Sequence, residues 1–418
     1  MAITIDPARF LDDLHTLRSF GASGTGVVRP SLSAVDMEAR RWLRDRMTDA
    51  GLDASIDGVG NVFGRAPGAG PALLVGSHSD TQPTGGWLDG ALGTIVGLEV
   101  ARAAREAASR GEADLAVDAV AWIDEEGTFG SCIGSRAYCG LTTDDELAAA
   151  ANDDGLSLTD AWTQAGLDGT PAAREPGRHV GFLEVHIEQG ANLERAGDDL
   201  GVVTAIVGSR NLTVRFVGQQ NHAGTTPMPL RRDAAMALFR FATAVDEAFT
   251  RLAGPRTVWT IGRVDVHPGA GSIIPGLAEL NLQFRDPELP RLEAMEAKAL
   301  ELVAAADAGP CDVSASPTTT PVDPAAMDPD LRRHLATAAA TLSESGWQEM
   351  PSAAVHDAMF LAEIMPAGML FVPSIDGISH DFAEDTAEPD LVRGCATLAA
   401  AAESILTEAT GADSAGGG

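Results

Sequence analysis

Histidines and carboxylates gather at four places in the sequence, each beside an apolar run that predicts a strand. The chain has nine histidines, and three of them lie in these segments. The segments are GSHSDTQPTGGWLDG (76–90), WIDEEGTFG (122–130), EVHIEQG (184–190) and GISHDFAEDT (377–386). Imidazole nitrogens and carboxylate oxygens bind divalent metal ions, and carboxylates also serve as general bases. The four segments could therefore form a metal site with a general base beside it.

The first segment brings His78, Asp80 and Asp89 to the end of one predicted strand, residues 71–78. Ligands of open α/β sheets collect outside the carboxyl ends of the strands, which is where His78 and Asp80 fall. Asp89 follows a glycine-rich turn and precedes a predicted helix, so it could instead cap that helix. His78 could likewise be a hydrogen-bonded loop histidine, and this segment alone leaves both alternatives open.

The second segment ends a predicted strand, residues 115–124, with the adjacent acids Asp124, Glu125 and Glu126. Three neighbouring carboxylates repel one another unless cations neutralise them. A solvated acidic turn is one interpretation of this segment. A metal site explains more, because one acid can bind a metal ion while its neighbour acts as a base.

The third and fourth segments add His186, with Glu188 beside it, and His380. Each is weak evidence alone, but together the four segments place a histidine or carboxylate group at four strand ends, which core packing does not explain. Two metal ions need several nitrogen or oxygen ligands and a carboxylate between them. The set that fits, with Asp89 as the bridge, is His78, Asp89, Glu126, His186 and His380.

The elements that must position these groups form an α/β fold. Residues 1–208 alternate between helical and apolar strand patterns, which predicts a catalytic domain with a mainly parallel sheet. Residues 209–325 predict an inserted βαββαβ (ferredoxin-like) domain. Its elements are expected at about 209–217, 231–252, 257–266, 277–285, 290–307 and 311–317. Residues 326–410 are expected to complete the catalytic domain, and residues 411–418 to form a disordered tail.

Composition excludes several classes of protein. The 418 residues are 45% hydrophobic and 21% charged, as in ordinary globular proteins, and no run is apolar enough to span a membrane. A net charge of −31 argues against nucleic-acid binding. The only lysine, Lys298, is in a helical stretch, which disfavours phosphate-loop and Schiff-base chemistry. Without an export signal we expect a cytoplasmic protein whose four cysteines are free thiols.

The motifs resemble those of one hydrolase family. They are GSHSDTQPTGGWLDGALG, DEEGTFG, HIEQG, NHAGTTPMPLRRDA and GISHDFAEDT. Over nearly the whole chain, and in the family's order, they resemble the hydantoinase/carbamoylase branch of the M20 metallopeptidase-like amidohydrolases. That branch includes N-carbamoyl-L-amino acid hydrolases, allantoate amidohydrolases, β-ureidopropionases and ureidoglycolate amidohydrolases. HIEQG and GQQNHAGTTPM are specific to it, since plain aminopeptidases of the superfamily differ there.

The resemblance implies a role for each matching residue. His78 and His186 would bind one metal ion, Glu126 and His380 the other, with Asp89 between them. The two ions per subunit would be Zn, Mn, Co or Ni. Asp80 would orient His78, and Glu125 would be the general base. The inserted domain would be a lid through which the chain forms a homodimer.

Further implied roles concern the substrate. His222 would reach the active site across the dimer and polarise the scissile carbonyl, and Arg285 would hold the substrate carboxylate. Gln189 would contact substrate, and His356, near a GHDA-like motif, is a further candidate. The chain departs from the family at Ser272, where members often carry asparagine, and in EEGTFG, which lacks the arginine of EEGSRF.

The predicted activity is hydrolysis of the carbamoyl or ureido C–N bond of a small carboxylate substrate, foremost an N-carbamoyl amino acid. Allantoate or ureidoglycolate is an alternative substrate, and another M20 deacylase or dipeptidase is an alternative enzyme. An alternative from another functional class is a dimeric binding protein that has lost catalysis and uses the former active-site cleft. All five proposed ligands and Glu125 are present, which speaks against that alternative.

Overall fold

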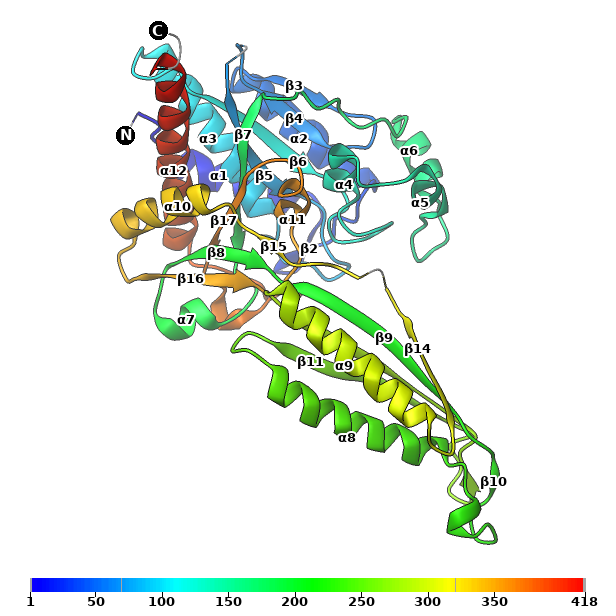
Figure 1. Cartoon of the computed structure of the whole chain (residues 1–418). Helices are drawn as coiled ribbons and strands as arrows, with labels where there is room; N and C mark the ends of the chain where they lie inside the picture. Colours follow the sequence, from blue (N-terminus) through cyan, green and yellow to red (C-terminus); the bar gives the residue numbers. More distant parts are fainter. Residues whose placement is uncertain (1, 69, 320, 416–418) are drawn as a thin grey trace. The chain divides into compact units, whose positions relative to one another are not determined.

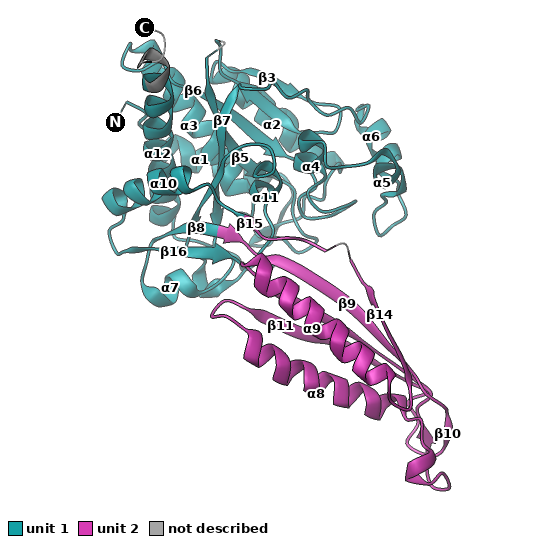
Figure 2. Cartoon of the chain, viewed as in Figure 1, with its two compact units in different colours: residues 1–204, 326–418 teal, residues 205–325 magenta. Residues whose placement is uncertain are grey.

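The computed structural model describes residues 2–68, 70–319 and 321–415, which divide into two compact units (Figure 2). Unit 1 comprises residues 1–204 and 326–418, and unit 2 comprises residues 205–325. None of the helices in the described part of the chain is long and apolar enough to cross a lipid bilayer.

Unit 1 is built on one large sheet with helices packed on it (Figure 1). Its helices are α1 (Pro7–Ser19), α2 (Ala34–Asp49), α3 (Ala91–Ser109), α4 (Ile133–Cys139), α5 (Asp144–Ala149), α6 (Leu158–Ala165), α7 (Asn192–Ala196), α10 (Pro329–Leu342), α11 (Asp357–Leu361) and α12 (Glu388–Ala415), with the 3-10 turn η2 (Ile375–Gly377). The sheet contains, in spatial order, β15 (Ala325–Ala326), β8 (Leu200–Ile206), β17 (Ala367–Val372), β7 (His179–Ile187), β5 (Ala72–His78), β6 (Ala116–Trp122), β4 (Val62–Arg65) and β3 (Asp53–Ile56), and β16 (Trp347–Ser352) pairs with β8. A separate hairpin consists of β1 (Ala22–Ser23) and β2 (Gly26–Val27).

The sheet is mixed, whereas the sequence predicted a mainly parallel one. Strands β17, β7, β5 and β6 are neighbours and run parallel. The flanking pairs β17–β8, β4–β6 and β3–β4 are antiparallel. The edge strand β3 reverses into β4 through a short connection, and such a connection can join only antiparallel strands.

The central strands are continuous apolar runs because they are covered on both faces. Every residue of β5 and β17 is buried. Helix α3 packs so closely that a Cβ at Gly97 would lie 2.4 Å from the Val75 carbonyl oxygen on β5. Close helix–strand contact of this kind needs small residues, which explains Gly93 and Gly97.

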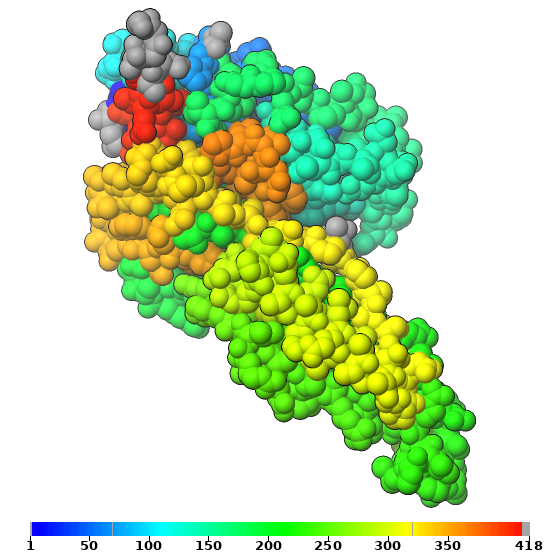
Figure 3. All heavy atoms as spheres, viewed as in Figure 1, coloured from blue at the N-terminus to red at the C-terminus, as the bar shows by residue number. Residues whose placement is uncertain are grey.

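The two ends of the chain lie together in unit 1. The Ile3 amide donates to Glu403 on the C-terminal helix α12 at 2.9 Å, and Figure 3 shows this red helix beside blue and cyan atoms of the first third of the chain. Helix α12 continues to Ala415, so the predicted tail from residue 411 begins as helix. Residues 416–418 of that predicted tail lie outside the described residues.

Unit 2 contains a four-stranded antiparallel sheet in the order β11-β13-β9-β14. Along the chain its main elements are β9 (Gly208–Val217), α8 (Ala234–Leu252), β11 (Val258–His267), β13 (Leu277–Asp286), α9 (Leu289–Asp307) and β14 (Asp312–Pro317). The short strands β10 (Asn221–His222) and β12 (Ile273–Ile274) pair apart from this sheet, and η1 (Met228–Leu230) precedes α8. Burial alternates along β9 and β13, because one sheet face packs against α8 and α9 in a shared apolar core.

Candidate metal centre

Parallel order of the four central strands brings the four predicted segments to one edge of the sheet. The chain leaves β5 at His78, β6 at Trp122, β7 at Ile187 and β17 at Val372. Since these strands are neighbours and parallel, their carboxyl ends and the loops that follow lie side by side. The convergence inferred from the sequence is therefore a consequence of sheet topology.

Asp89 lies at the centre of the resulting cluster. Its Oδ1 is 3.0 Å from His186 Nε2 and 3.4 Å from His78 Nε2. Its Oδ2 is 3.2 Å from His380 Nε2, which is in turn 3.6 Å from Glu126 Oε2. The structure thus forms two candidate metal-binding groups that share Asp89, namely His78–Asp89–His186 and Asp89–Glu126–His380.

Asp89 does not act as the helix cap that the sequence left open. The N-cap position of α3 is Gly90, and no side chain makes a capping hydrogen bond there. The Asp89 carboxylate points instead to three histidines, which leaves its two oxygens on two different ligand groups.

The two buried histidines present the nitrogen that a metal ion needs. His78 Nδ1 lies 3.1 Å from the Asp80 carbonyl, and His186 Nδ1 lies 2.9 Å from the Ile187 carbonyl. A carbonyl can only accept, so in the neutral rings Nδ1 carries the proton and Nε2 holds a lone pair. The Nε2 of His186 also accepts from the Gly90 amide at 3.1 Å. His78 Nε2 is buried and has no hydrogen-bond partner among the described residues. A lone pair facing a carboxylate is unfavourable unless a cation lies between them, and so the residues fit a metal site.

The electrostatics of the cluster also call for positive charge. Burial by itself raises the pKa of Asp89, but contacts with His186, His380 and His78 outweigh it and hold that pKa well below its usual range. Burial would lower the pKa of His78, yet the carboxylates of Glu125, Asp89 and Asp80 raise it well above its ordinary value. Contact with Asp89 raises the pKa of His380 to about 9. These pKa shifts indicate that the cluster has excess negative charge, which protons neutralise when no metal ion is bound.

The three adjacent acids after β6 have three different surroundings. Asp124, at φ 59°, accepts from the backbone amides of Phe129 and Gly130 and so fixes the loop. Glu126 faces His380, and burial together with Asp89 raises its pKa to about 7. Glu125 faces His78 at 3.6 Å without belonging to either ligand group. Burial raises the pKa of Glu125 well above its ordinary value, as suits a general base.

Asp80 contacts His78 mainly through its backbone. Its carbonyl accepts from His78 Nδ1, whereas its carboxylate is 3.7 Å from that nitrogen. The carboxylate accepts from the amides of Glu125 and Glu126 at 3.4 and 3.2 Å. Asp80 therefore links the first ligand loop to the second as well as orienting the histidine.

Two buried side chains that the sequence did not single out complete the loops. Glu384 accepts from the backbone amides of Leu88 and Asp89, both at 3.0 Å, and from Ser379 Oγ at 2.8 Å. It joins the loop of Asp89 to the loop of His380. Cys132 Sγ lies 3.8 Å from Glu125 Oε1. Glu384 stands four residues after His380, but the sequence holds no local signal for its partners.

Gln189 contacts Asp89, and His356 packs against His186. The Gln189 side-chain amide donates to Asp89 Oδ2 at 2.8 Å and is held by a backbone at φ 57°. The His356 ring is buried 4.4 Å from the His186 ring, and its Nε2 pairs with Ser352 Oγ. Burial and the neighbouring His186 lower the pKa of His356 well below its usual range. With Glu184, the two histidines form a third group of possible ligands.

Glu184 could have been noticed in the sequence. It interrupts the apolar strand FLEVHI two residues before His186, so both side chains lie on the same face. It is fully buried and accepts from Ser77 Oγ at 2.6 Å and from the Ala358 amide at 3.1 Å. A charged residue inside a buried strand usually signals a polar network.

The remaining predicted site residues belong to unit 2. His222 on β10 pairs with Ile273 on β12, and the Ser272 carbonyl accepts from the Ala223 amide, so His222 and Ser272 lie in one exposed ladder. His222 Nδ1 accepts from the amides of Gly224 and Thr225. The ring therefore carries its proton on Nε2 when neutral. Arg285, on β13, is on the sheet face opposite the apolar core.

The chain is similar to known amidohydrolases over most of its length. The family model of peptidase family M20/M25/M40 matches residues 74–404. The N-carbamoyl-L-amino-acid amidohydrolase of Paenarthrobacter aurescens is 36% identical over 397 residues, covering 92% of this chain and 95% of that protein. The allantoate amidohydrolase of Escherichia coli (strain K12) is 34% identical over 402 residues, covering 93% and 95%. The crystal structure of a hydantoinase/carbamoylase family amidase from Burkholderia phymatum is 54% identical, with a TM-score of 0.90 and coverage of 97% and 98%.

Proposed function

The chain belongs to peptidase family M20/M25/M40, as the motifs predicted, and from this premise we propose that it hydrolyses the carbamoyl C–N bond of N-carbamoyl-L-amino acids. Its relatives are amidohydrolases that act on non-peptide C–N bonds. The observation that carries the proposal is the Asp89-centred pair of ligand groups with Glu125 beside it. Allantoate is the second candidate substrate, since the allantoate amidohydrolase is nearly as similar.

Two divalent ions are proposed as cofactors. His78, His186 and Asp89 would hold one, and Glu126, His380 and Asp89 the other. Cations bound there would act as Lewis acids and lower the pKa of water from 15.7 to about 7. Mixed nitrogen and oxygen ligands accept Zn, Mn, Co or Ni.

The chain's own residues would supply the proton transfers. Glu125 is buried next to His78 and is a stronger base than an exposed carboxylate. It would take the proton of the attacking water and pass it to the leaving amine. The Asp80 carboxylate would hold Glu125 in place by accepting from the Glu125 backbone amide.

Further residues are proposed to orient the substrate. Gln189, next to Asp89, would contact the substrate, and His356 would support His186 from beneath. His222, whose neutral ring carries its proton on Nε2, would donate to the oxygen that gains negative charge. Arg285 would pair with the substrate carboxylate. Ser272, in the same ladder as His222, would hydrogen-bond to that carboxylate.

Homodimer formation through unit 2 is part of the proposal. Large apolar side chains are exposed there on η1 and α8, namely Met228, Leu230, Met236 and Phe239. Exposed apolar groups of this kind mark protein interfaces. Light scattering should give twice the mass of one chain. A fully active monomer would contradict the proposal that His222 reaches the active site across the dimer.

A substrate panel with a matched variant tests the function. Metal-loaded protein would be offered N-carbamoyl-L-amino acids, allantoate, ureidoglycolate and dipeptides, with ammonia and amino-acid release measured. We expect ammonia release to be fastest from an N-carbamoyl-L-amino acid, and Glu125→Gln to lose about 10²–10⁴-fold in kcat while keeping its metal. Release of amino acids from dipeptides alone, or an unimpaired Glu125→Gln enzyme, contradicts the proposal.

A further inference from the structure

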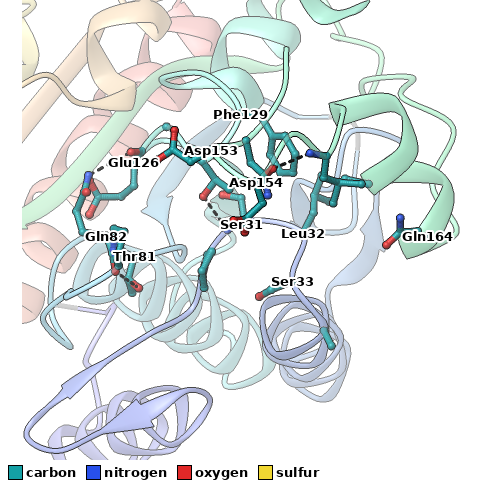
Figure 4. Close-up of a pocket in the computed structure, with 18 residues that line it drawn as sticks. Ser31, Leu32, Ser33, Thr81, Gln82, Glu126, Phe129, Asp153, Asp154 and Gln164 are labelled. Carbon is teal, nitrogen blue, oxygen red and sulfur yellow. Dashed lines mark hydrogen bonds between the residues drawn. The ribbon is translucent and has the colours of Figure 1, made fainter.

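A cavity of about 530 Å³ adjoins the candidate metal centre within unit 1 (Figure 4). Glu126, whose carboxylate faces His380, forms part of its wall. Gln82 lies beside it and donates to the Glu126 carboxylate at 2.8 Å. Cavities of about 300–1,000 Å³ are typical of small-molecule sites. A substrate whose scissile bond lies at the metal centre therefore has room for a further substituent here.

Part of the cavity wall is apolar and firmly supported. Leu32, Phe129 and Leu156 line it, and Phe129 packs into a hydrophobic cluster that is separate from the main core. Trp162 on α6 belongs to that cluster and donates its indole N–H to the Val59 carbonyl at 2.9 Å. An aliphatic stem would find apolar contacts along this wall.

The charged residues of the wall are all acidic, namely Glu126, Asp153 and Asp154. Asp153 and Asp154 occupy the turn between Ala151 and Ser157, which are joined by a β-bridge. Figure 4 shows Gln82 and Glu126 at one end of the lining and Gln164 at the other, with Asp153 and Asp154 between them. None of the described residues that line the cavity is Arg, Lys or His. Beyond Glu126, the wall therefore offers negative charge that nothing in the lining neutralises.

We propose that this cavity receives the substrate side chain and favours an aliphatic stem that ends in a cationic amine or guanidinium group. The inference rests on the proposed function and narrows its substrate class to N-carbamoyl derivatives of basic amino acids. The stem would pack near Phe129 and Leu156, and the cation would pair with Asp153 and Asp154. Because both carboxylates are exposed, the expected preference is modest, about fivefold to tenfold in kcat/KM.

Two substrates that differ only at the end of the side chain test the inference. Nα-carbamoyl-L-lysine carries an amine on the carbon atom that is the terminal methyl group of Nα-carbamoyl-L-norleucine. With metal-loaded wild type, kcat/KM for the lysine compound should exceed that for norleucine by about fivefold to tenfold. The ratio should fall toward one in D153N/D154N, while norleucine turnover stays unchanged. It should also fall in 1 M NaCl, which screens exposed charges.

A matched control separates a local effect from net charge. D144N/D145N removes two exposed carboxylates from α5 that do not line the cavity, and it should keep the wild-type ratio. A wild-type ratio of one or below, or an unchanged ratio in D153N/D154N, overturns the inference and leaves the carbamoylase proposal standing. Absence of ammonia from every N-carbamoyl compound overturns the proposed function itself and the inference with it.

Discussion

At the scale of single residues, the site depends on which atom each side chain directs toward Asp89. His78 and His186 each commit Nδ1 to a backbone carbonyl, so both Nε2 atoms face Asp89. Asp89 divides its two oxygens between two ligand groups. The backbone of Asp89 is held in turn by Glu384, a buried carboxylate that touches no proposed ligand side chain except through Ser379.

Glu384 should therefore tune metal binding as a positioning residue. Replacing Glu384 with Ala removes the acceptor for the Leu88 and Asp89 amides and frees the loop of Asp89. We expect metal affinity to fall about 10–100-fold, as for other residues that orient ligands. Calorimetric titration of metal into the metal-free protein measures it. Glu384→Gln, which keeps an acceptor oxygen, should lie between Ala and wild type, and equal affinity in all three would refute this role.

At the scale of elements, the turn into α3 sets the distance between Asp89 and the histidines. Gly90 has φ 65°, donates to His186 Nε2 at 3.1 Å, and would bring a Cβ within 2.4 Å of the His78 ring. Only glycine can approach the ring this closely in the left-handed region.

Gly90→Ala should displace His78 and weaken metal binding more than backbone strain alone explains. The matched control is Gly197→Ala, since Gly197 also has positive φ, at 73°, but a Cβ there would meet nothing within 4 Å. Both variants should lose about 1 kcal/mol or more of stability. Metal content measured after gel filtration should drop in Gly90→Ala alone, and equal losses in the two variants would point to strain.

Asp118 lies on strand β6, and its ion-pair network should make the stability of the fold depend on pH. Burial would raise the pKa of Asp118, but hydrogen bonds from His179 and Arg178 outweigh it and lower that pKa. A lowered pKa in the folded state means that Asp118 stabilises the fold above about pH 4 and that this stability is lost as pH falls through the folded-state pKa.

Asp118→Asn should accordingly destabilise the protein by about 3 kcal/mol at neutral pH, because Arg178 is left buried without its charge partner. Urea unfolding at pH 7, 5 and 3.5 should show the gap between variant and wild type narrowing at the lowest pH. A gap that is constant with pH would mean that the ionised carboxylate is not the stabilising form.

At the scale of the whole molecule, we expect metal binding to be coupled to folding. The proposed ligands come from residues 78 to 380, and so they meet only in the folded chain. A ligand that binds only the folded state stabilises it by about 4 kcal/mol at 1,000 times its dissociation constant. Exhaustive chelation should therefore lower Tm by several degrees, and added Zn, Mn, Co or Ni should restore it. An unchanged Tm would indicate that the cluster binds no metal in solution.

Sequence patterns predicted the elements closely where periodicity and caps are local. The strand expected at about 209–217 is observed as β9 at Gly208–Val217, and the helix expected at about 290–307 is observed as α9 at Leu289–Asp307. His334 shows the limit of such reasoning. It stands in a helix of mixed polarity that gives no sign of burial, yet it is buried and bonded to Ser404 on α12.

The sequence by itself determined the family, the segments that carry chemistry and the residue types they bring. These properties follow from motifs and local patterns, which act over a few neighbouring residues. Tertiary structure decided which atoms meet: the parallel neighbours β17, β7, β5 and β6 set the four loops side by side, and Glu384 and Gln82 gained partners far along the chain. It also decided that the outer strands are antiparallel. Contacts between distant segments depend on strand order and packing, and no local pattern specifies either.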